Sequence, residues 1–169
     1  MNLATSSRLY HLEIMRYIII DTREQKPFDF PLNVPIKRAT LKTGDYAIEG
    51  DNFFSIERKS KADFLGTIFH DWARFKRELQ RMDESRFVAK VIVVEADFMD
   101  FLFTENANGE LTAPNYTNTN ITPQAIITRI AELALMNVTV LLCKNAEYAA
   151  TMAYYLLLNR LKQLNKIEI

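Results

Sequence analysis

Short apolar runs that end in charged residues alternate with turns through the first third of this chain. Ile18–Ile20 leads directly into Asp21, and Phe53–Ile56 leads into Glu57. Such runs are typical of short strands, and a continuously apolar run such as Ile18–Ile20 is typical of a strand buried on both faces. A sheet of buried strands needs helices on its faces, so the pattern favours the α/β class. It also places carboxylates at the ends of strands.

The remaining pattern predicts a mixed sheet with helices on both faces. Strands are expected at Tyr17–Asp21, Ile36–Leu41, Asp45–Glu49, Phe53–Arg58, Phe87–Glu95 and Val138–Leu142. Helices are expected from Ser60 to Ile68, Asp71 to Met82, Thr122 to Met136 and Asn145 to Leu161. The proline-rich Lys26–Pro35 and the polar Asn106–Asn120 are expected to be loops. The order predicts an opening meander followed by strand–helix–strand–helix units.

Composition narrows the function classes. The 169 residues predict one domain, with residues 1–16 as a lead-in and 17–169 as the folded unit. The formal net charge is zero, which argues against a polycationic DNA binder but allows an acidic site beside a local basic patch. The single Cys143 excludes an intramolecular disulfide and predicts a buried thiol. A cytoplasmic protein without a membrane span is expected.

The chemistry-bearing residues follow two of the predicted strands. Gly44-Asp45-Tyr46 begins one strand, and Ile56-Glu57-Arg58-Lys59 ends the next. Alternate residues of a strand share a face, so Glu57 and Lys59 should point the same way and Arg58 the other way. Two carboxylates can hold Mg²⁺ together with waters and phosphate oxygens. A neighbouring lysine can orient water or stabilise transition-state charge, which is the chemistry of phosphodiester cleavage.

The wider string of motifs resembles the XPF-type nuclease domain of structure-specific DNA endonucleases. The matching positions are Asp21-Thr22-Arg23-Glu24, Gly44-Asp45, and Glu57-Arg58-Lys59 followed by Asp63. The resemblance extends over roughly residues 17 to 160. It implies a restriction-endonuclease-like central mixed sheet flanked by helices. It also implies a Mg²⁺- or Mn²⁺-dependent endonuclease that cuts branched, flap or partly single-stranded DNA.

The resemblance also implies roles for individual residues. Asp45, Glu57 and the Arg58 carbonyl would bind the metal, and Asp21 and Glu24 would complete the site or hold a second ion. Lys59 would act on the attacking water or the transition state. Asp63 and Arg58 would support the site by ion pairing.

Several of these residues also have simpler interpretations. Asp63 fits the third helical position after a Ser60 cap, and Arg58 fits a structural ion pair. Glu95 ends a strand and is either a carboxylate at the edge of the site or only a strand terminus. The basic side chains near the site are either DNA contacts or a solvated surface; they are Lys61, Arg74, Lys76, Arg77 and Arg81.

The sequence also leads us to expect a particular oligomeric state and domain context. The helix from Asn145 is apolar around most of its circumference, and related domains pair through this region, which implies a homodimer. Relatives add helix-hairpin-helix modules whose turns need glycine. The four glycines all precede the last predicted strand, so a stand-alone version from a bacterial, phage or mobile-element setting is expected.

Two other functions stay open at the level of sequence. One is a non-catalytic, DNA-binding scaffold or partner subunit of a nuclease complex. The clustered charges of Glu57, Arg58 and Lys59 speak against it, because a retired site has no physical reason to keep them. The other is a restriction-like or recombination nuclease with a different substrate geometry.

Overall fold

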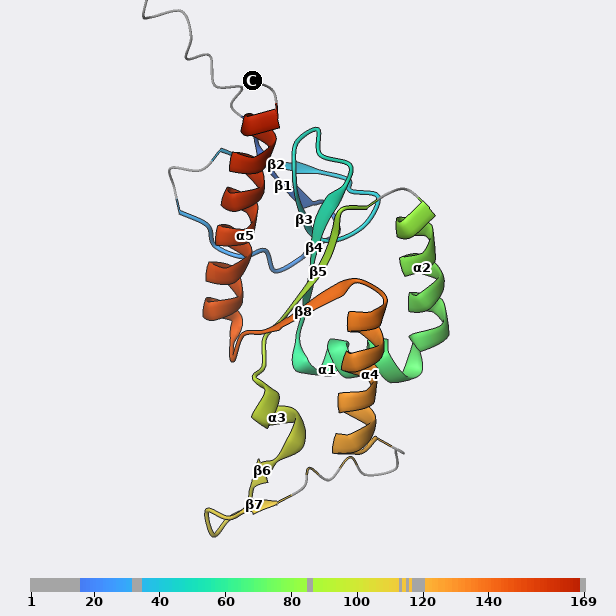
Figure 1. Ribbon diagram of the computed structural model, residues 1–169. Helices are drawn as coiled ribbons and strands as arrows, with labels where there is room; N and C mark the ends of the chain where they lie inside the picture. The colour runs from blue at the N-terminus through green and yellow to red at the C-terminus, as the bar shows by residue number, and fades with distance from the viewer. Residues whose placement is uncertain are drawn as a thin grey trace, which may run out of the picture.

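A six-stranded mixed sheet forms the centre of the computed structural model (Figure 1). The structure describes residues 16–31, 35–84, 87–112, 114, 116 and 121–167. The strands are β1 (Ile18–Asp21), β2 (Ile36–Ala39), β3 (Tyr46–Ile48), β4 (Phe54–Lys59), β5 (Ala89–Val94) and β8 (Val138–Leu142). Their order is β2-β1-β3-β4-β5-β8. This arrangement confirms the predicted α/β class, and every strand expected from the sequence is present.

The predicted opening meander is wrong. β2 does not pair with β3 but lies beside β1, parallel to it, with Ile18 opposite Ile36. β3 lies between β1 and β4 and is antiparallel to both. Burial explains the choice: all of β3 is buried, whereas Ile36, Lys37 and Arg38 of β2 are exposed, as suits an edge strand. From β4 onward the strands β4, β5 and β8 are parallel, as the strand–helix–strand pattern predicts.

Helices cover both faces of the sheet (Figure 1). One face carries α1 (Lys61–Leu65), the π-helical turn η1 (Gly66–His70), α2 (Trp72–Glu84), α3 (Phe98–Leu102) and α4 (Pro123–Leu135). The other face carries α5 (Ala146–Ile167). On the α5 face, Phe28 and Phe30 of the proline-rich segment pack against Tyr46. On the α2 face, Phe64, Ile68 and Trp72 pack against β5. The core is therefore two layers separated by the sheet.

Several boundaries differ from expectation. The helix expected to reach Ile68 ends at Leu65 and continues as η1, and α5 runs past Leu161 to Ile167. The short α3 was not expected; Asp97 and Asp100 cap it reciprocally. A hairpin of β6 (Thr104–Glu105) and β7 (Leu111–Thr112) enters the predicted 106–120 loop. These elements are too short to show a period. Residues 1–15 of the predicted lead-in and residues 113, 115 and 117–120 lie outside the described residues.

A buried ion pair fastens α5 to the β3–β4 turn. Arg160 donates from Nε to Asp51 Oδ2 at 2.6 Å and from Nη2 to Asp51 Oδ1 at 3.2 Å. The Asp51 side chain is fully buried, so this two-point contact defines how α5 lies on the sheet. Cys143 is a buried free thiol, as predicted. In the described part of the chain, every helix is too short or too polar to cross a membrane.

Candidate active site

Neighbouring ends of β3 and β4 bring Asp45, Glu57 and Lys59 together. The Asp45 backbone N–H donates to the Ile56 carbonyl at 2.8 Å, which places Asp45 beside the end of β4. Its carboxylate Oδ2 accepts the Arg58 backbone N–H at 2.7 Å. Glu57 and Lys59 share a face of β4, and Lys59 Nζ lies 2.7 Å from Glu57 Oε1. The predicted alternation along β4 therefore produces a compact group of one cation and two carboxylates.

The electrostatics of this group favour an added positive charge. Burial and, after it, the negative charge of Glu57 raise the pKa of the Asp45 carboxyl from 3.8 to about 7. Glu24 adds to this effect, while the hydrogen bond from the Arg58 backbone and the charge of Lys59 act in the opposite direction. Burial of Asp45 and repulsion from Glu57 thus together outweigh the groups that stabilise the Asp45 carboxylate. A bound cation would remove that repulsion.

The donor set fits Mg²⁺ or Mn²⁺ bound by few protein ligands. These ions take oxygen ligands and keep several waters, so one or two carboxylates are enough. Asp45 and Glu57 supply them on adjacent strands, and the Arg58 carbonyl lies between Glu57 and Lys59 in the chain. Over the described residues, no group of three or more His, Cys, Asp or Glu side chains is arranged to hold a metal. The structure therefore does not gather all four predicted carboxylates into one cluster.

Asp21 makes a different set of contacts. Its Oδ1 accepts the Arg23 backbone N–H at 2.8 Å and Arg23 Nε at 2.7 Å, and its Oδ2 accepts the Leu41 backbone N–H at 2.6 Å. The Arg23 side chain and these backbone donors lower the pKa of the Asp21 carboxyl to about 2. Both oxygens thus bind protein donors that join the ends of β1 and β2. The contacts favour a positioning role over metal ligation.

Arg58 and Glu24 lie on the α5 side of the site. Arg58 Nε donates to Glu95 Oε1 at 2.5 Å, and Nη1 lies 3.5 Å from Glu24 Oε1. Its guanidinium also stacks 4.8 Å from the centre of the Phe28 ring. The Arg58 side chain is therefore a structural ion-pair partner, as its simpler interpretation predicts, while its backbone faces Asp45. Glu95 belongs to the edge of the site through this contact.

The other predicted site residues are more scattered. Ser60 caps α1, accepting the Asp63 N–H at 3.1 Å and donating to Asp63 Oδ2 at 2.6 Å, so Asp63 has the capping role. Lys61 Nζ donates to the Asp100 carbonyl and lies over the Phe101 ring, which ties α3 to α1. Lys61 is thus engaged within the protein.

The basic face of α2 remains on the surface. Arg74, Lys76, Arg77 and Arg81 are all exposed, and Arg74 Nη2 pairs with Asp71 at 2.9 Å. Asp71 raises the pKa of the Arg74 guanidinium most strongly, and Glu78 and Glu57 contribute in the same direction. Arg74 thus lies within electrostatic reach of the carboxylate group. Trp72 and Leu79 are buried, as the helical spacing predicts.

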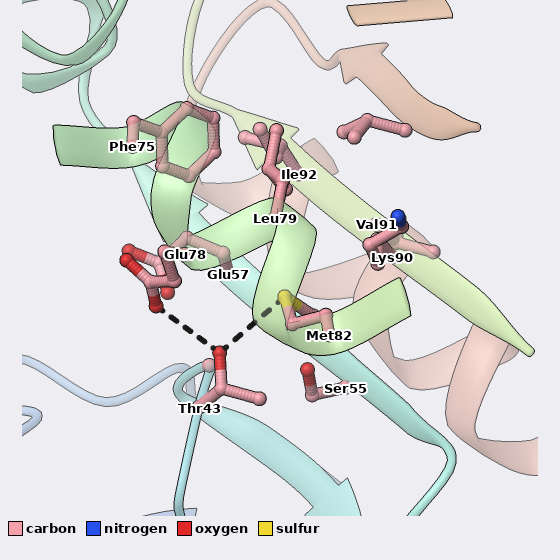
Figure 2. Close-up of a pocket in the computed structure, with 12 residues that line it drawn as sticks. Thr43, Ser55, Glu57, Phe75, Glu78, Leu79, Met82, Lys90, Val91 and Ile92 are labelled. Carbon is pink, nitrogen blue, oxygen red and sulfur yellow. Dashed lines mark hydrogen bonds between the residues drawn. The ribbon is translucent and has the colours of Figure 1, made fainter. Parts of the chain in front are cut away.

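A small cavity connects α2 with the carboxylate group (Figure 2). It measures about 20 Å³, enough for a water molecule, and Thr43, Glu57 and Glu78 line it together with apolar side chains. Sequence reasoning did not select Thr43, Glu78 or Arg23. The available signals were the position of Thr43 directly before Gly44-Asp45, of Glu78 one helical turn after Arg74, and of Arg23 inside the Asp21–Glu24 motif.

Comparison with known proteins identifies the family of this chain. Two of the similar solved structures share 19% sequence identity with this chain. They are XPF from Aeropyrum pernix, with a TM-score of 0.60 over 84% of this chain and 65% of that chain, and XPF from Aeropyrum pernix in complex with DNA, with a TM-score of 0.62 over 88% and 66%. This chain thus spans slightly less than two thirds of either one. No curated protein matches it. The model of the ERCC4 domain matches residues 20–156, which include Asp21, Asp45, Glu57 and Lys59, and the chain therefore belongs to the ERCC4 domain family.

Proposed function

We propose that this protein is a Mg²⁺- or Mn²⁺-dependent DNA endonuclease that hydrolyses phosphodiester bonds. The observation that carries the proposal is the convergence of Asp45, Glu57 and Lys59 at neighbouring strand ends. Their charges are those that in-line attack on a phosphodiester needs: two carboxylates for a divalent ion and one ammonium group for the phosphate. We take residues 17–169 as one nuclease domain.

Each residue has a distinct part in the proposed reaction. Asp45, Glu57 and the Arg58 carbonyl would hold the ion, which supplies Lewis-acid activation of the phosphate and of the attacking water. Lys59 is held beside Glu57 before substrate arrives, with little side-chain freedom left to lose. In the complex its ammonium group would face the scissile phosphate and stabilise the charge that develops there. Asp21 and Arg58 would hold the ends of β1 and β4 in place through their ion pairs.

DNA would approach along the exposed basic face of α2. Arg74, Arg77 and Arg81 can contact phosphates without reading bases, and Glu57 lines the cavity beneath this helix. The similar XPF structure that was solved with DNA supports a DNA substrate. We propose branched, flap or partly single-stranded DNA as the substrate class, because the family resemblance implies it. Lys61 is excluded from this set by its contacts with α3.

The outward side of α5 supports a homodimer. Tyr148, Met152 and Tyr155 recur at helical spacing and are exposed over 57%, 39% and 57% of their surface. Large apolar side chains in a row on a helix are typical of an interface between proteins. We propose that a second copy of this chain covers them.

A cleavage panel tests the proposed function. Labelled flap, fork, splayed-arm and linear DNAs are incubated with Mg²⁺, with Mn²⁺ and with EDTA. We expect metal-dependent cleavage of at least one branched substrate, and a loss of at least about 100-fold in Asp45→Asn, Glu57→Gln and Lys59→Ala. The exposed Glu84→Gln on α2 is the matched control and should cut normally.

Two outcomes would contradict the proposal. Normal cleavage by Glu57→Gln would refute the assignment of the site. Tight DNA binding without cleavage under every metal condition would instead favour the non-catalytic scaffold.

A further inference from the structure

The side chains of Thr43 and Glu78, which lie outside the proposed metal site, join the turn that carries Asp45 to α2. Thr43 Oγ1 donates toward Glu78 Oε1 at 3.3 Å and lies 3.8 Å from Met82 Sδ, one helical turn further along α2. Figure 2 shows the Thr43 hydroxyl pointing to both partners from below the helix. Thr43 and Glu78 lie 35 residues apart, so this contact connects two elements that do not pair through their backbones.

The residues after Thr43 in this turn are held by the neighbouring strands. Gly44 has φ of +76°, and a Cβ there would lie 2.8 Å from Ser55 Cβ. Asp45 is bonded on both sides to strand backbone: its N–H donates to Ile56, and its carbonyl accepts the Asp21 N–H at 2.8 Å. The sheet thus holds Asp45 from the sides, while Thr43 supplies hydrogen bonds from the same turn to α2.

The chemistry of Glu78 suits a positioning role better than a ligand role. It is partly buried in the same cavity as Glu57, and its Oε1 accepts the Thr43 hydroxyl at 3.3 Å. A carboxylate beside the proposed path of DNA repels phosphate, so a DNA contact does not explain Glu78. Its hydrogen bond from Thr43 does, and this bond links the Asp45 turn to the helix whose basic face is proposed to bind DNA.

We propose that Thr43 and Glu78 are a positioning pair that couples α2 to Asp45 and so maintains the metal-binding geometry. This inference rests on the proposed function, since it assigns to Asp45 a role in metal binding. The pair acts through Asp45 and contacts neither metal nor DNA. Its loss should therefore weaken metal binding and slow cleavage at limiting metal, without changing KM for DNA.

Paired substitutions separate the hydrogen bond from charge and shape. Thr43→Val and Glu78→Met remove the donor and the acceptor, whereas Thr43→Ser and Glu78→Gln keep them. Glu84→Met is the control for a lost carboxylate on the same helix. We expect Thr43→Val and Glu78→Met each to weaken Mn²⁺ binding about three- to tenfold, and the conservative variants to stay near wild type. The double variant should match either single one, because both remove the same contact.

Mn²⁺ titration by calorimetry without DNA measures this effect independently of cleavage. Cleavage kinetics on a substrate that the wild type cuts should show reduced kcat at low Mn²⁺, recovery at saturating Mn²⁺ and constant KM. Thermal melts verify that each variant folds. Wild-type metal affinity in Thr43→Val, or additive effects in the double variant, would overturn the positioning pair while leaving the proposed function intact. A wild-type protein that binds no divalent ion would overturn both.

Discussion

At the scale of single residues, the candidate site holds a carboxylate, Asp45, whose charged form lowers folding stability. Burial makes the charge of Asp45 costly, and repulsion from the neighbouring Glu57 adds to that cost. Asp21, one strand away, shows the opposite situation, because Arg23 and Leu41 satisfy its carboxylate. Two acids on neighbouring strands thus have pKa values displaced in opposite directions. Such divergence separates the carboxylate that we propose to bind a cation from one that already has its partners.

Asp45→Asn should stabilise the metal-free protein while abolishing cleavage. The folded pKa of about 7 lies above the unfolded value, so ionised Asp45 disfavours folding. Wild-type stability should therefore fall relative to Asp45→Asn as pH rises from about 4 to 7, and the full difference should persist above that range. At pH 8, we expect the free energy of unfolding of Asp45→Asn to exceed that of the wild type by about 1–3 kcal/mol. Urea unfolding in EDTA measures it, and a less stable Asp45→Asn protein would contradict the electrostatic argument.

Asp21→Asn should behave in the opposite way. The folded pKa of about 2 lies below the unfolded value, so the ionised carboxylate stabilises the fold above about pH 4. That contribution disappears as pH falls from about 4 through 2. We expect Asp21→Asn to lower the free energy of unfolding by about 1–2 kcal/mol at neutral pH. The loss stays this small because Arg23 is exposed to solvent, which weakens the ion pair. The exposed Asp29→Asn is the control, and a deficit of Asp21→Asn that did not shrink in acid would exclude the ion pair as its cause.

At the scale of elements, the tight approach of the β2–β3 connection to β4 sets the position of Asp45. Gly44 and Gly50 both have positive φ, at +76° and +79°. They differ in the space around them: a Cβ on Gly44 would meet Ser55 Cβ at 2.8 Å, whereas one on Gly50 would meet only the flexible Arg16 Nη1, at 3.4 Å. Comparing substitutions at Gly44 and Gly50 therefore separates the cost of backbone strain from the cost of a steric clash.

Gly44→Ala should be markedly more harmful than Gly50→Ala. Positive φ alone costs about 1 kcal/mol in each variant. The clash with Ser55 should add about 1–3 kcal/mol in Gly44→Ala and displace Asp45, so cleavage should also fall. Denaturant melts and cleavage rates of both variants provide the comparison. Equal stability losses would show that the turn relaxes without moving β4.

At the scale of the whole molecule, the net charge is zero, but the charged site and the exposed apolar row lie on different faces. The basic face of α2 and the carboxylates beneath it lie on one side of the sheet, and the outward row of α5 lies on the other. DNA and a second copy would therefore bind opposite faces. Neither would block the other.

Light scattering should give about twice the monomer mass of 19.6 kDa at micromolar concentration. Tyr155→Glu places a charge in the exposed row of α5 and should yield a monomer with nearly unchanged melting temperature. Gln124→Glu, an exposed position on α4, is the matched control and should remain dimeric. A wild-type protein that is monomeric at these concentrations would exclude the proposed interface.

Much of the candidate site follows from local rules. The alternation of strand residues predicts that Glu57 and Lys59 share a face, and Lys59 Nζ lies beside Glu57 Oε1 accordingly. The role of Asp21 did not follow, because its Leu41 donor is 20 residues away and reaches it only through the pairing of β1 with β2. Thr43 and Glu78 were missed for the same reason.

The sequence by itself determined the strands, most of the helices and the residue types at the strand ends, because hydrophobic period and capping act over a few neighbouring residues. The tertiary structure alone decided that β2 joins β1 at the edge of the sheet, since burial of β3 had to be satisfied between two partners. It also decided how the carboxylates are engaged: Leu41, 20 residues away, bonds the Asp21 oxygen that the neighbouring Arg23 backbone does not reach, and Arg58, 13 residues away, bonds Oδ2 of Asp45. Competition for hydrogen-bond donors across the folded sheet is the physical reason, and no local pattern encodes it.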